Sequence, residues 1–353
     1  MKKILLGLLV LSLMASVSSA QFLVGARAAG MGGVGVATCR DLSAAYYNPA
    51  AIMKTGTVGG MASVGVAYDG MDKIMAAAAG AADPAKFVSD NFANNIALNG
   101  NLGGIFGLNI NKIGISVMPN LGLNLNKPAA SLQANGMAGL TYSAPLTMGY
   151  TFGLPGLPAL DVGANLKYVG MMSGWVNANA LGAGNQAIVN STGFGVDLGA
   201  LMTFNIPAVT ELSVGLAIRD LAENTNTNTK TYALTPGAGN TFTSTLVSDV
   251  NTTQTVNSSY ALGVAGNIPV VGLLCAADLE SGNGFTNTHI GVEYPILAGL
   301  AAIRAGLASG NALSLTTFGA KIGLPFFTLN AALMMDGKNT KNNQIFIDLA
   351  GGV

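Results

Sequence analysis

The sequence predicts an all-β transmembrane protein, an antiparallel β-barrel of about fourteen strands. Only 9% of the 353 residues are charged, against about 25% in an ordinary soluble domain, although half are hydrophobic. Beyond residue 20, no run of 18 apolar residues free of turn breakers predicts a membrane-spanning helix. Many segments instead alternate apolar and polar residues. In lipid, backbone amides must be bonded internally, and a closed barrel is the alternative to helices.

Composition excludes several classes. Disorder requires low hydrophobicity and high charge, and the chain has neither. Sixteen basic residues balance sixteen acidic ones, so no basic surplus indicates nucleic acid as a partner. Glycine accounts for 48 residues, about twice the usual share, as close strand approach in a barrel tolerates. A Gly-rich secreted β-protein is the soluble alternative.

Residues 1–20 are predicted to be a cleaved signal peptide. Lys2 and Lys3 precede the apolar stretch 4–14, and Ser18 and Ala20 are small residues at the −3 and −1 positions of a cleavage site. The signal peptide predicts export from the bacterial cytoplasm, and the outer membrane is the expected location. Residues 21–56 lack strand alternation and look like an insert that precedes a barrel formed by residues 57–353.

The barrel is predicted from strands that carry their charges on one face. Leu160, Leu166 and Tyr168 form an apolar row opposite Asp161 and Lys167. Residues 312–322 are ambiguous, with apolar side chains on both faces. The predicted strands are 57–68, 101–110, 113–125, 138–152, 159–175, 188–205, 211–223, 256–268, 270–281, 285–296, 300–309, 312–323, 326–336 and 344–351.

The connections alternate in length. Those after odd-numbered strands include 69–100, 126–137, 176–187 and 224–255, whereas those after even-numbered strands stay within about six residues. This parity supports fourteen strands with short periplasmic turns. Within 72–98, an Ala-rich run is either a short amphipathic helix over the barrel mouth or an ordinary surface loop. The Asn/Thr-rich segment 224–255 is predicted to be a solvated loop with little packing.

The N-terminal segment carries a recognisable pattern. Gly25-Ala26-Arg27-Ala28-Ala29-Gly30-Met31-Gly32-Gly33 leads to Asp41-Leu42-Ser43-Ala44-Ala45-Tyr46-Tyr47-Asn48-Pro49-Ala50. This pattern resembles the start of the FadL/TodX outer-membrane transport superfamily, especially its PorV and TraF-like (conjugal transfer) branch. The resemblance implies a fourteen-stranded barrel whose lumen is closed by an N-terminal hatch, here residues 21–56. The implied hatch motif is Gly30, Gly32, Gly33, Asn48, Pro49 and Ala50.

Physical reasoning agrees with a hatch. Its glycines permit tight turns in a confined lumen, and Asn48 before Pro49 favours a turn. Hatch residues Arg27, Arg40, Asp41 and Lys54 are expected to face charges on the inner wall. Such charges either line a route or only form salt bridges between hatch and wall. The candidate lumen charges are Arg27, Arg40, Asp161, Lys167, Asp197, Arg219, Asp278, Glu280, His289, Glu293 and Arg304.

Two prolines suggest a side exit. In the fatty-acid-transporting relatives that the chain resembles, hydrophobic ligands reach the hatch and leave through a strand kink. Pro119 lies inside the third predicted strand and Pro145 inside the fourth. Proline removes a ladder donor, so the two residues predict a weakened seam that serves as a lateral gate. Alternatively, both prolines lie at rims or bulges.

Catalysis has little support, and no enzyme, cofactor or metal site is predicted. His289 is the single histidine and is expected to form a buried polar pair with Glu293. An oxidising compartment would permit a disulfide between Cys39 and Cys275. However, Cys275 shares the lipid-side parity of Leu273 and Leu279, which argues against pairing with a hatch residue.

Two functions remain open. The first is an outer-membrane channel for small hydrophobic, long-chain fatty-acid-like molecules. The second is a PorV-like scaffold or shuttle that binds exported proteins at the cell surface. Outer-membrane lipid is a partner in both, and the hatch motif and the prolines favour the channel.

Overall fold

The computed structural model describes residues 23–67, 96–127, 133–153, 155–179, 184–206, 209–236, 242–282, 284–311, 313–338 and 343–352. The predicted signal peptide and residues 72–95 of the predicted mouth segment lie outside the described residues. Among those described, no helix is long and apolar enough to cross a membrane.

Strands dominate the described chain, and three short helices precede them. The helices of the hatch are α2 (Ala26–Ala29), α3 (Ala44–Tyr47) and the 3-10 helix η1 (Pro49–Lys54). The strands are β1 (Val58–Ala67), β2 (Ile96–Ile110), β3 (Ile113–Lys127), β4 (Gln133–Phe152), β5 (Leu160–Asn179), β6 (Gly184–Ile206), β7 (Val209–Arg219), β8 (Asn224–Pro236), β9 (Phe242–Thr255), β10 (Ser259–Ile268), β11 (Leu273–Gly282), β12 (Phe285–Ile296), β13 (Ala301–Gly310), β14 (Ser314–Gly323), β15 (Phe327–Asp336) and β16 (Gln344–Gly352). A further 3-10 turn, η2 (Leu297–Gly299), joins β12 to β13.

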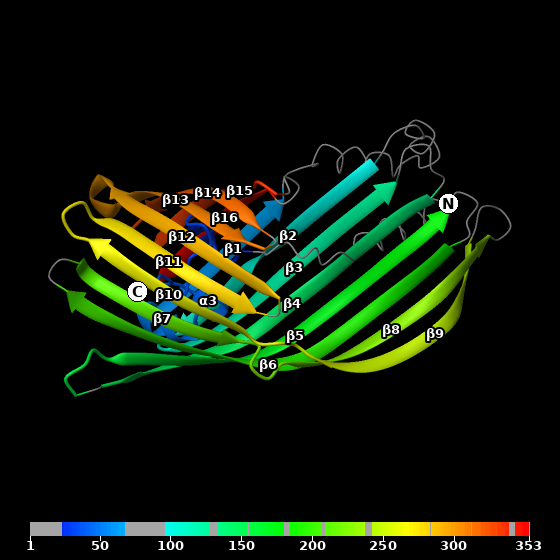
Figure 1. The fold of residues 1–353 in the computed structure, drawn as a ribbon, viewed down its shortest axis with the longest axis horizontal. Coiled ribbons are helices and arrows are strands. Elements are labelled where there is room, and N and C mark those ends of the chain that lie inside the picture. Colours follow the sequence, from blue (N-terminus) through cyan, green and yellow to red (C-terminus); the bar gives the residue numbers. More distant parts are fainter. Residues whose placement is uncertain are drawn as a thin grey trace.

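The strands close into a fourteen-stranded antiparallel barrel (Figure 1). Strands β1 to β7 pair in order, β7 pairs with β10, and β10 to β16 continue in order. The barrel closes where β16 pairs with β1, over nine residue pairs from Gly59↔Gly352 to Ala67↔Gln344. The predicted fold class and the predicted number of barrel strands are confirmed.

The predicted loop 224–255 is wrong, because it forms the hairpin β8–β9. Strand β6 has 23 residues and exceeds its partner β7, so its first part pairs with β8 instead. Threonine favours strands, and polar side chains link the two strands of the hairpin across the ladder. Asn228 donates to Asp249 at 2.7 Å, and Thr253 donates to Asn226 at 2.9 Å. Asn/Thr composition therefore indicated a solvated strand pair here, not an irregular loop.

The barrel wall is tall on one side and low on the other. Strands β4 and β5 have 20 residues each, whereas β10, β11 and β13 have ten. The long strands project beyond the short ones at the end away from the short turns, and the β8–β9 hairpin extends this projection (Figure 1). We call the projecting end the outer end, because barrels of this kind carry short turns on the periplasmic side.

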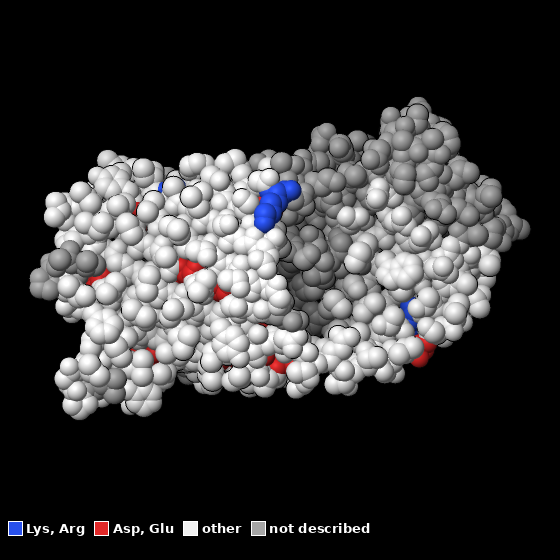
Figure 2. All heavy atoms as spheres, viewed as in Figure 1, with Lys and Arg blue, Asp and Glu red and all other residues white. Residues whose placement is uncertain are grey.

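The outer face of the barrel is apolar and the inner face carries the charges. On β5, Leu166 is 53% exposed on the outside, whereas Asp161 is 4% exposed on the inside. The ambiguous predicted strand 312–323 follows the same rule, with Phe318 outside and Thr317 inside. Figure 2 shows one side of the molecule with only isolated charged side chains on a broad uncharged surface.

Candidate functional site

The hatch fills the middle of the barrel. Its residues form most of the largest buried apolar cluster, which includes Met31, Leu42, Tyr47 and Ile52. Burial raises the pKa of the Tyr47 phenol, as expected for a group removed from water. The hatch therefore supplies the side chains that pack the lumen.

The wall receives the hatch on glycines. A Cβ atom added at any of nine wall glycines would come within 3.1 Å of a hatch atom. We call these residues the glycine girdle: Gly114, Gly149, Gly163, Gly199, Gly215, Gly263, Gly291, Gly306 and Gly319. They lie on nine strands from β3 to β14, and several are direct cross-strand neighbours. The girdle lets the hatch backbone touch the wall backbone.

The predicted hatch motif makes the complementary contacts. Gly32 has a φ of +74°, and a Cβ there would meet the backbone of Leu307 and Ile290 at 2.7 to 2.8 Å. Gly30 lies against Gly319, and Gly33 against the ring of His289. Only glycine satisfies both the left-handed backbone and the close approach at position 32.

Asn48 ties the second half of the hatch together. It is fully buried, its amide donates to the carbonyls of Val36 at 2.8 Å and Ala200 at 3.1 Å, and its side-chain oxygen accepts from Ala50 N–H at 3.1 Å. Pro49 follows as the first residue of η1, where its missing N–H has no helical partner to lose. The Asn-Pro-Ala triplet thus caps η1 and binds the wall.

Wall side chains also satisfy the hatch backbone. One carboxylate oxygen of Asp278 accepts from the N–H groups of Gly35 at 2.7 Å and Val36 at 2.9 Å. Asp348 accepts from Ala26 N–H at 2.7 Å, and Asn165 donates to the Ala45 carbonyl at 2.7 Å. Buried backbone groups in such a lumen require partners of this kind.

Three hatch cations reach wall carboxylates. Arg27 donates to Glu293 through two nitrogens at 3.1 Å each, and Arg304 binds the same carboxylate at 2.6 Å. Lys54 pairs with Asp161 at 2.9 Å. Arg40 pairs with Glu211 at 3.0 Å in an exposed position. Asp41, expected to face the wall, instead accepts from Ser43 within the hatch.

The remaining predicted charges pair within the wall, nearer the outer end. Lys167 binds Asp197 at 2.8 Å and Glu223 at 3.1 Å, and it also binds Asp220. Arg219 pairs with Glu280 and lies over the Tyr46 ring, 5.5 Å from its centroid.

The expected pair of His289 with Glu293 is not formed. His289 lies 3.6 Å from Glu280, and its Nδ1 contacts the Gly32 carbonyl at 2.7 Å. Glu293 is occupied by the two arginines described above. Both residues have inward parity on β12, but four residues of an extended strand hold them too far apart to share a proton.

An upper cavity of about 1090 Å³ lies on the outer side of the hatch. The hatch contributes Val24, Ala45 and Tyr46 to its lining. Met118, Val169 and Met334 give it apolar walls. Five carboxylates and two cations also line it: Asp197, Asp220, Glu223, Glu280 and Asp336, with Lys167 and Arg219. The cavity is therefore an apolar chamber with an excess of negative charge.

The wall beside the upper cavity has an interrupted ladder, which we call the seam. Between β2 and β3, pairing stops after Gly103↔Asn120 and resumes at Phe106↔Val117. Between β3 and β4, it stops after Met118↔Ser143 and resumes at Ile115↔Leu146. Pro119 and Pro145 stand at these two gaps, where each lacks the N–H that the ladder needs. Both prolines are thus inside strands.

The upper cavity extends to the seam. Pro119, its cross-strand partner Tyr142 and the nearby Gly170 all line it. Tyr142 packs on Gly170 so closely that a Cβ there would lie 2.6 Å from the ring atom Cε1. Tyr142, Tyr168 and Phe194 follow one another on β4, β5 and β6, with ring centroids 5.9 and 5.3 Å apart.

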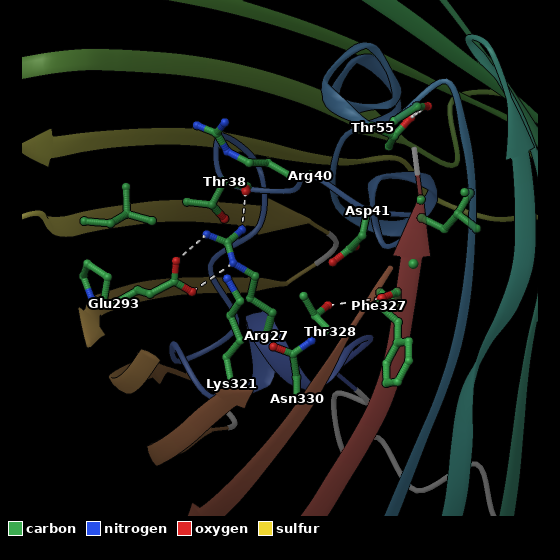
Figure 3. A pocket seen from close by; sticks show the side chains of 18 of the residues that line it. Arg27, Thr38, Arg40, Asp41, Thr55, Glu293, Lys321, Phe327, Thr328 and Asn330 are labelled. Atoms are coloured by element: carbon green, nitrogen blue, oxygen red, sulfur yellow. Dashed lines mark hydrogen bonds and ion pairs between the residues drawn. The ribbon is translucent and has the colours of Figure 1, made fainter. Parts of the chain in front are cut away.

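A lower cavity of about 710 Å³ lies on the periplasmic side of the hatch (Figure 3). Hatch residues Arg27, Arg40 and Asp41 line it together with Glu293 and Lys321 of the wall. The two cavities share no lining residue, and the hatch separates them.

The two cysteines are free. Cys39 is buried in the hatch, with its sulfur 3.2 Å from the Ser43 hydroxyl, and Cys275 lies half-buried on β11. Burial, with Asp41 nearby, raises the pKa of the Cys39 thiol. Among the described residues, no group of three or more His, Cys, Asp or Glu side chains is arranged to hold a metal ion.

Sequence reasoning missed several residues of this site. The glycine girdle is hidden among 48 glycines, although its members recur on the charged, inward parity of their strands. Asp220 and Glu223 fall within the predicted strand 211–223, but β7 ends at Arg219, so alternation does not place these two side chains. The aromatic row with Tyr142 has no sequence signal, because it depends on register between three strands.

Comparisons with known proteins bear on the fold. No protein-family model and no curated protein sequence matches the chain. Among solved structures, the toluene transporter TbuX of Ralstonia pickettii has a TM-score of 0.59 and 13% identity, with 92% of this chain and 97% of that chain covered. The monoaromatic hydrocarbon channel CymD has a TM-score of 0.58 and 11% identity, with 93% of this chain and 96% of that chain covered. The toluene transporter TodX of Pseudomonas putida has a TM-score of 0.52 and 10% identity, with 92% of this chain and 95% of that chain covered.

These three structural neighbours are FadL-family transporters or channels, not enzymes. They confirm the fold that the resemblance to the FadL/TodX superfamily implies. None of the three bears on the PorV branch.

Proposed function

We propose that the chain is an outer-membrane channel for small hydrophobic molecules, which enter the upper cavity and leave sideways through the seam. The barrel with its apolar outer face, and its structural neighbours, indicate the bacterial outer membrane. The observation that supports the route is the upper cavity, which the hatch closes from below while its side extends to the interrupted ladder.

The hatch favours a sideways route over a vertical one. It contacts nine wall strands through the glycine girdle, seven of them with backbone atoms, and buried hydrogen bonds and ion pairs hold it there. Opening a vertical passage would break many of these contacts together. At the seam, some backbone pairs are already absent, so a sideways opening breaks fewer contacts. An apolar ligand that leaves there enters lipid directly.

The charges of the upper cavity set an order among ligands. The sequence suggested long-chain fatty-acid-like molecules, and the named neighbours include transporters of toluene. Five carboxylates against two cations disfavour an ionised fatty acid, because like charges repel strongly in a chamber of low dielectric. We therefore expect neutral hydrocarbons to pass faster than fatty acids of equal length.

The test is uptake by a bacterial host that lacks its own transporter of this fold. Cells that express the chain are expected to take up decane faster than cells with an empty vector, and faster than they take up decanoate at pH 7. Mass spectrometry of the purified barrel is expected to find a bound apolar molecule. Equal uptake with and without the chain would overturn the channel.

One observation favours the alternative, a surface scaffold for exported proteins. The β8–β9 hairpin stands above the low wall, and among the described residues β9 pairs only with β8. A free strand edge can accept a strand from another protein. Reproducible protein companions of the intact chain that are lost on deletion of residues 224–255, together with absent hydrocarbon uptake, would favour this role.

A further inference from the structure

We propose that the lower cavity is a binding site for a small organic anion, a carboxylate carried on a compact apolar body. This site lies on the opposite side of the hatch from the upper cavity and does not depend on the hydrophobic channel. The proposal rests on the balance of charges, on one lysine that has no carboxylate partner among the described residues, and on the apolar part of the lining.

The charges that line the lower cavity leave a cationic excess. Four cations line it, namely Arg27, Arg40, Arg304 and Lys321, against the three carboxylates of Asp41, Glu211 and Glu293. This is the reverse of the upper cavity. An anion entering from the periplasm therefore meets attraction here.

The carboxylates present are already engaged. Glu293 is shared between Arg27 and Arg304, so one negative charge serves two guanidinium groups. Asp41 accepts from the backbone and the hydroxyl of Ser43. Glu211 pairs with Arg40, and both side chains are about half exposed, so this pair holds Arg40 only weakly.

Lys321 supplies a cation that an anion can reach. Within the described part of the chain it forms no ion pair, and its ammonium reaches only the Gly299 carbonyl, at 3.5 Å. In Figure 3, Lys321 of the wall and Arg27 of the hatch extend in the same direction, and their charged ends lie next to each other in the view. A carboxylate placed between them would accept charge-assisted hydrogen bonds from both.

The rest of the lining selects the body of the ligand. Leu42 of the hatch, Leu274 of β11 and Phe327 of β15 line the same cavity. Apolar surface next to a cationic group favours an organic acid over a fully hydrated inorganic anion. The volume of about 710 Å³ accommodates a ligand the size of a substituted benzoate.

The experiment measures binding of benzoate to the intact barrel by calorimetry, in a neutral maltoside detergent that does not compete. Benzoate is expected to bind saturably and about tenfold more tightly than benzyl alcohol, which keeps the ring and lacks the charge. Lys321→Gln is expected to weaken benzoate about tenfold and leave benzyl alcohol unchanged. Because benzoate bridges hatch and wall, it also raises the melting temperature of the native chain.

Lys338→Gln is the matched control. Lys338 lies toward the outer end, where its ammonium binds the carbonyls of Gly310 and Asn311 at 2.7 and 3.1 Å, and it does not line the lower cavity. Equal affinity for benzoate and benzyl alcohol, an unchanged affinity in Lys321→Gln, or the absence of saturable binding would each overturn the site. Inorganic phosphate binding as tightly as benzoate would overturn the assignment to an organic acid.

Discussion

The glycine girdle and the seam are two regions of one barrel wall that are built on opposite rules. At the girdle, the wall loses its side chains so that the hatch backbone lies directly against it. At the seam, the wall keeps its side chains and loses backbone pairs, because Pro119 and Pro145 cannot donate. The first region holds a plug in place, and the second weakens the contact between neighbouring strands. Rigidity and opening thus fall at different heights of the wall, and β3 and β4 take part in both, with Gly114 and Gly149 in the girdle.

The largest expected effect comes from adding a side chain to the girdle. In Gly306→Leu, the new Cβ would lie 2.7 Å from the Gly32 Cα, and its three nearest atoms all belong to the hatch backbone, which has no flexible group to yield. We expect a loss of about 3 kcal/mol in the free energy of unfolding and an increase in ion conductance as the hatch is displaced. Urea unfolding and planar-bilayer recordings measure the two effects.

The control for this variant is Gly153→Leu. Gly153 follows β4 and has no atom within 4 Å of an added Cβ. An unchanged conductance and unfolding midpoint in Gly306→Leu would show that the girdle does not hold the hatch.

The second prediction repairs the seam. Pro119→Thr combined with Pro145→Thr restores two ladder donors in residues that favour strands. We expect hydrocarbon uptake to fall about tenfold, and hydrogen exchange of residues 104–105 and 116–118 to slow. The native chain is expected to exchange these amides faster than those of β5.

Pro295→Thr is the control for the seam, because Pro295 lies in β12 with its pair to Ala302 intact. Uniform protection across β2, β3 and β4 in the native chain would contradict the seam as a weak contact.

A smaller effect is expected from Gly170→Ala. The added methyl group would displace the Tyr142 ring from its place against β5, beside the seam. We expect uptake to change about fivefold and stability to fall by about 1 kcal/mol. Uptake assays on Gly170→Ala, Tyr142→Ala and the double variant form a cycle. Strictly additive effects would mean that the two residues do not act together.

The smallest effect concerns Cys39, which reports how tightly the girdle holds the hatch. Burial raises the pKa of its thiol, so the reactive thiolate stays scarce as the pH rises from 7 to 9. A hydrophilic maleimide is therefore expected to leave Cys39 unlabelled at both values in the folded protein, and to label it after unfolding. Labelling is measured by mass spectrometry in the Cys275→Ser variant, where Cys39 is the remaining cysteine. Rapid labelling at pH 9 would indicate a loose hatch.

The barrel was well predicted because its two signals, alternation along a strand and the length of each connection, are local in the sequence. Alternation of Leu166 with Lys167, or of Ile347 with Asp348, depends on the strand alone. The hairpin β8–β9 was missed because Asn and Thr are shared by loops and by strands with water on both faces. Its pairing with β6 follows from the extra length of β6, which no local pattern reveals.

Prediction of the site was less complete because its contacts are distant in sequence. Arg27 and Glu293 were both identified as lumen charges, but their pairing requires the packed hatch. His289 was assigned the wrong carboxylate because strand parity gives the face of a residue and not its nearest neighbour. The seam prolines were found because proline acts through its own missing N–H.

The hatch also constrains the order of assembly. It precedes β1 in the chain, yet Ala26 bonds to Asp348 of the last strand, 322 residues away. Strand β16 must pair with β1 to close the ring, and a segment that contacts nine strands at close range does not readily enter a finished barrel. We therefore expect the ring to be completed around a hatch already in place, with the β1–β16 contact forming last.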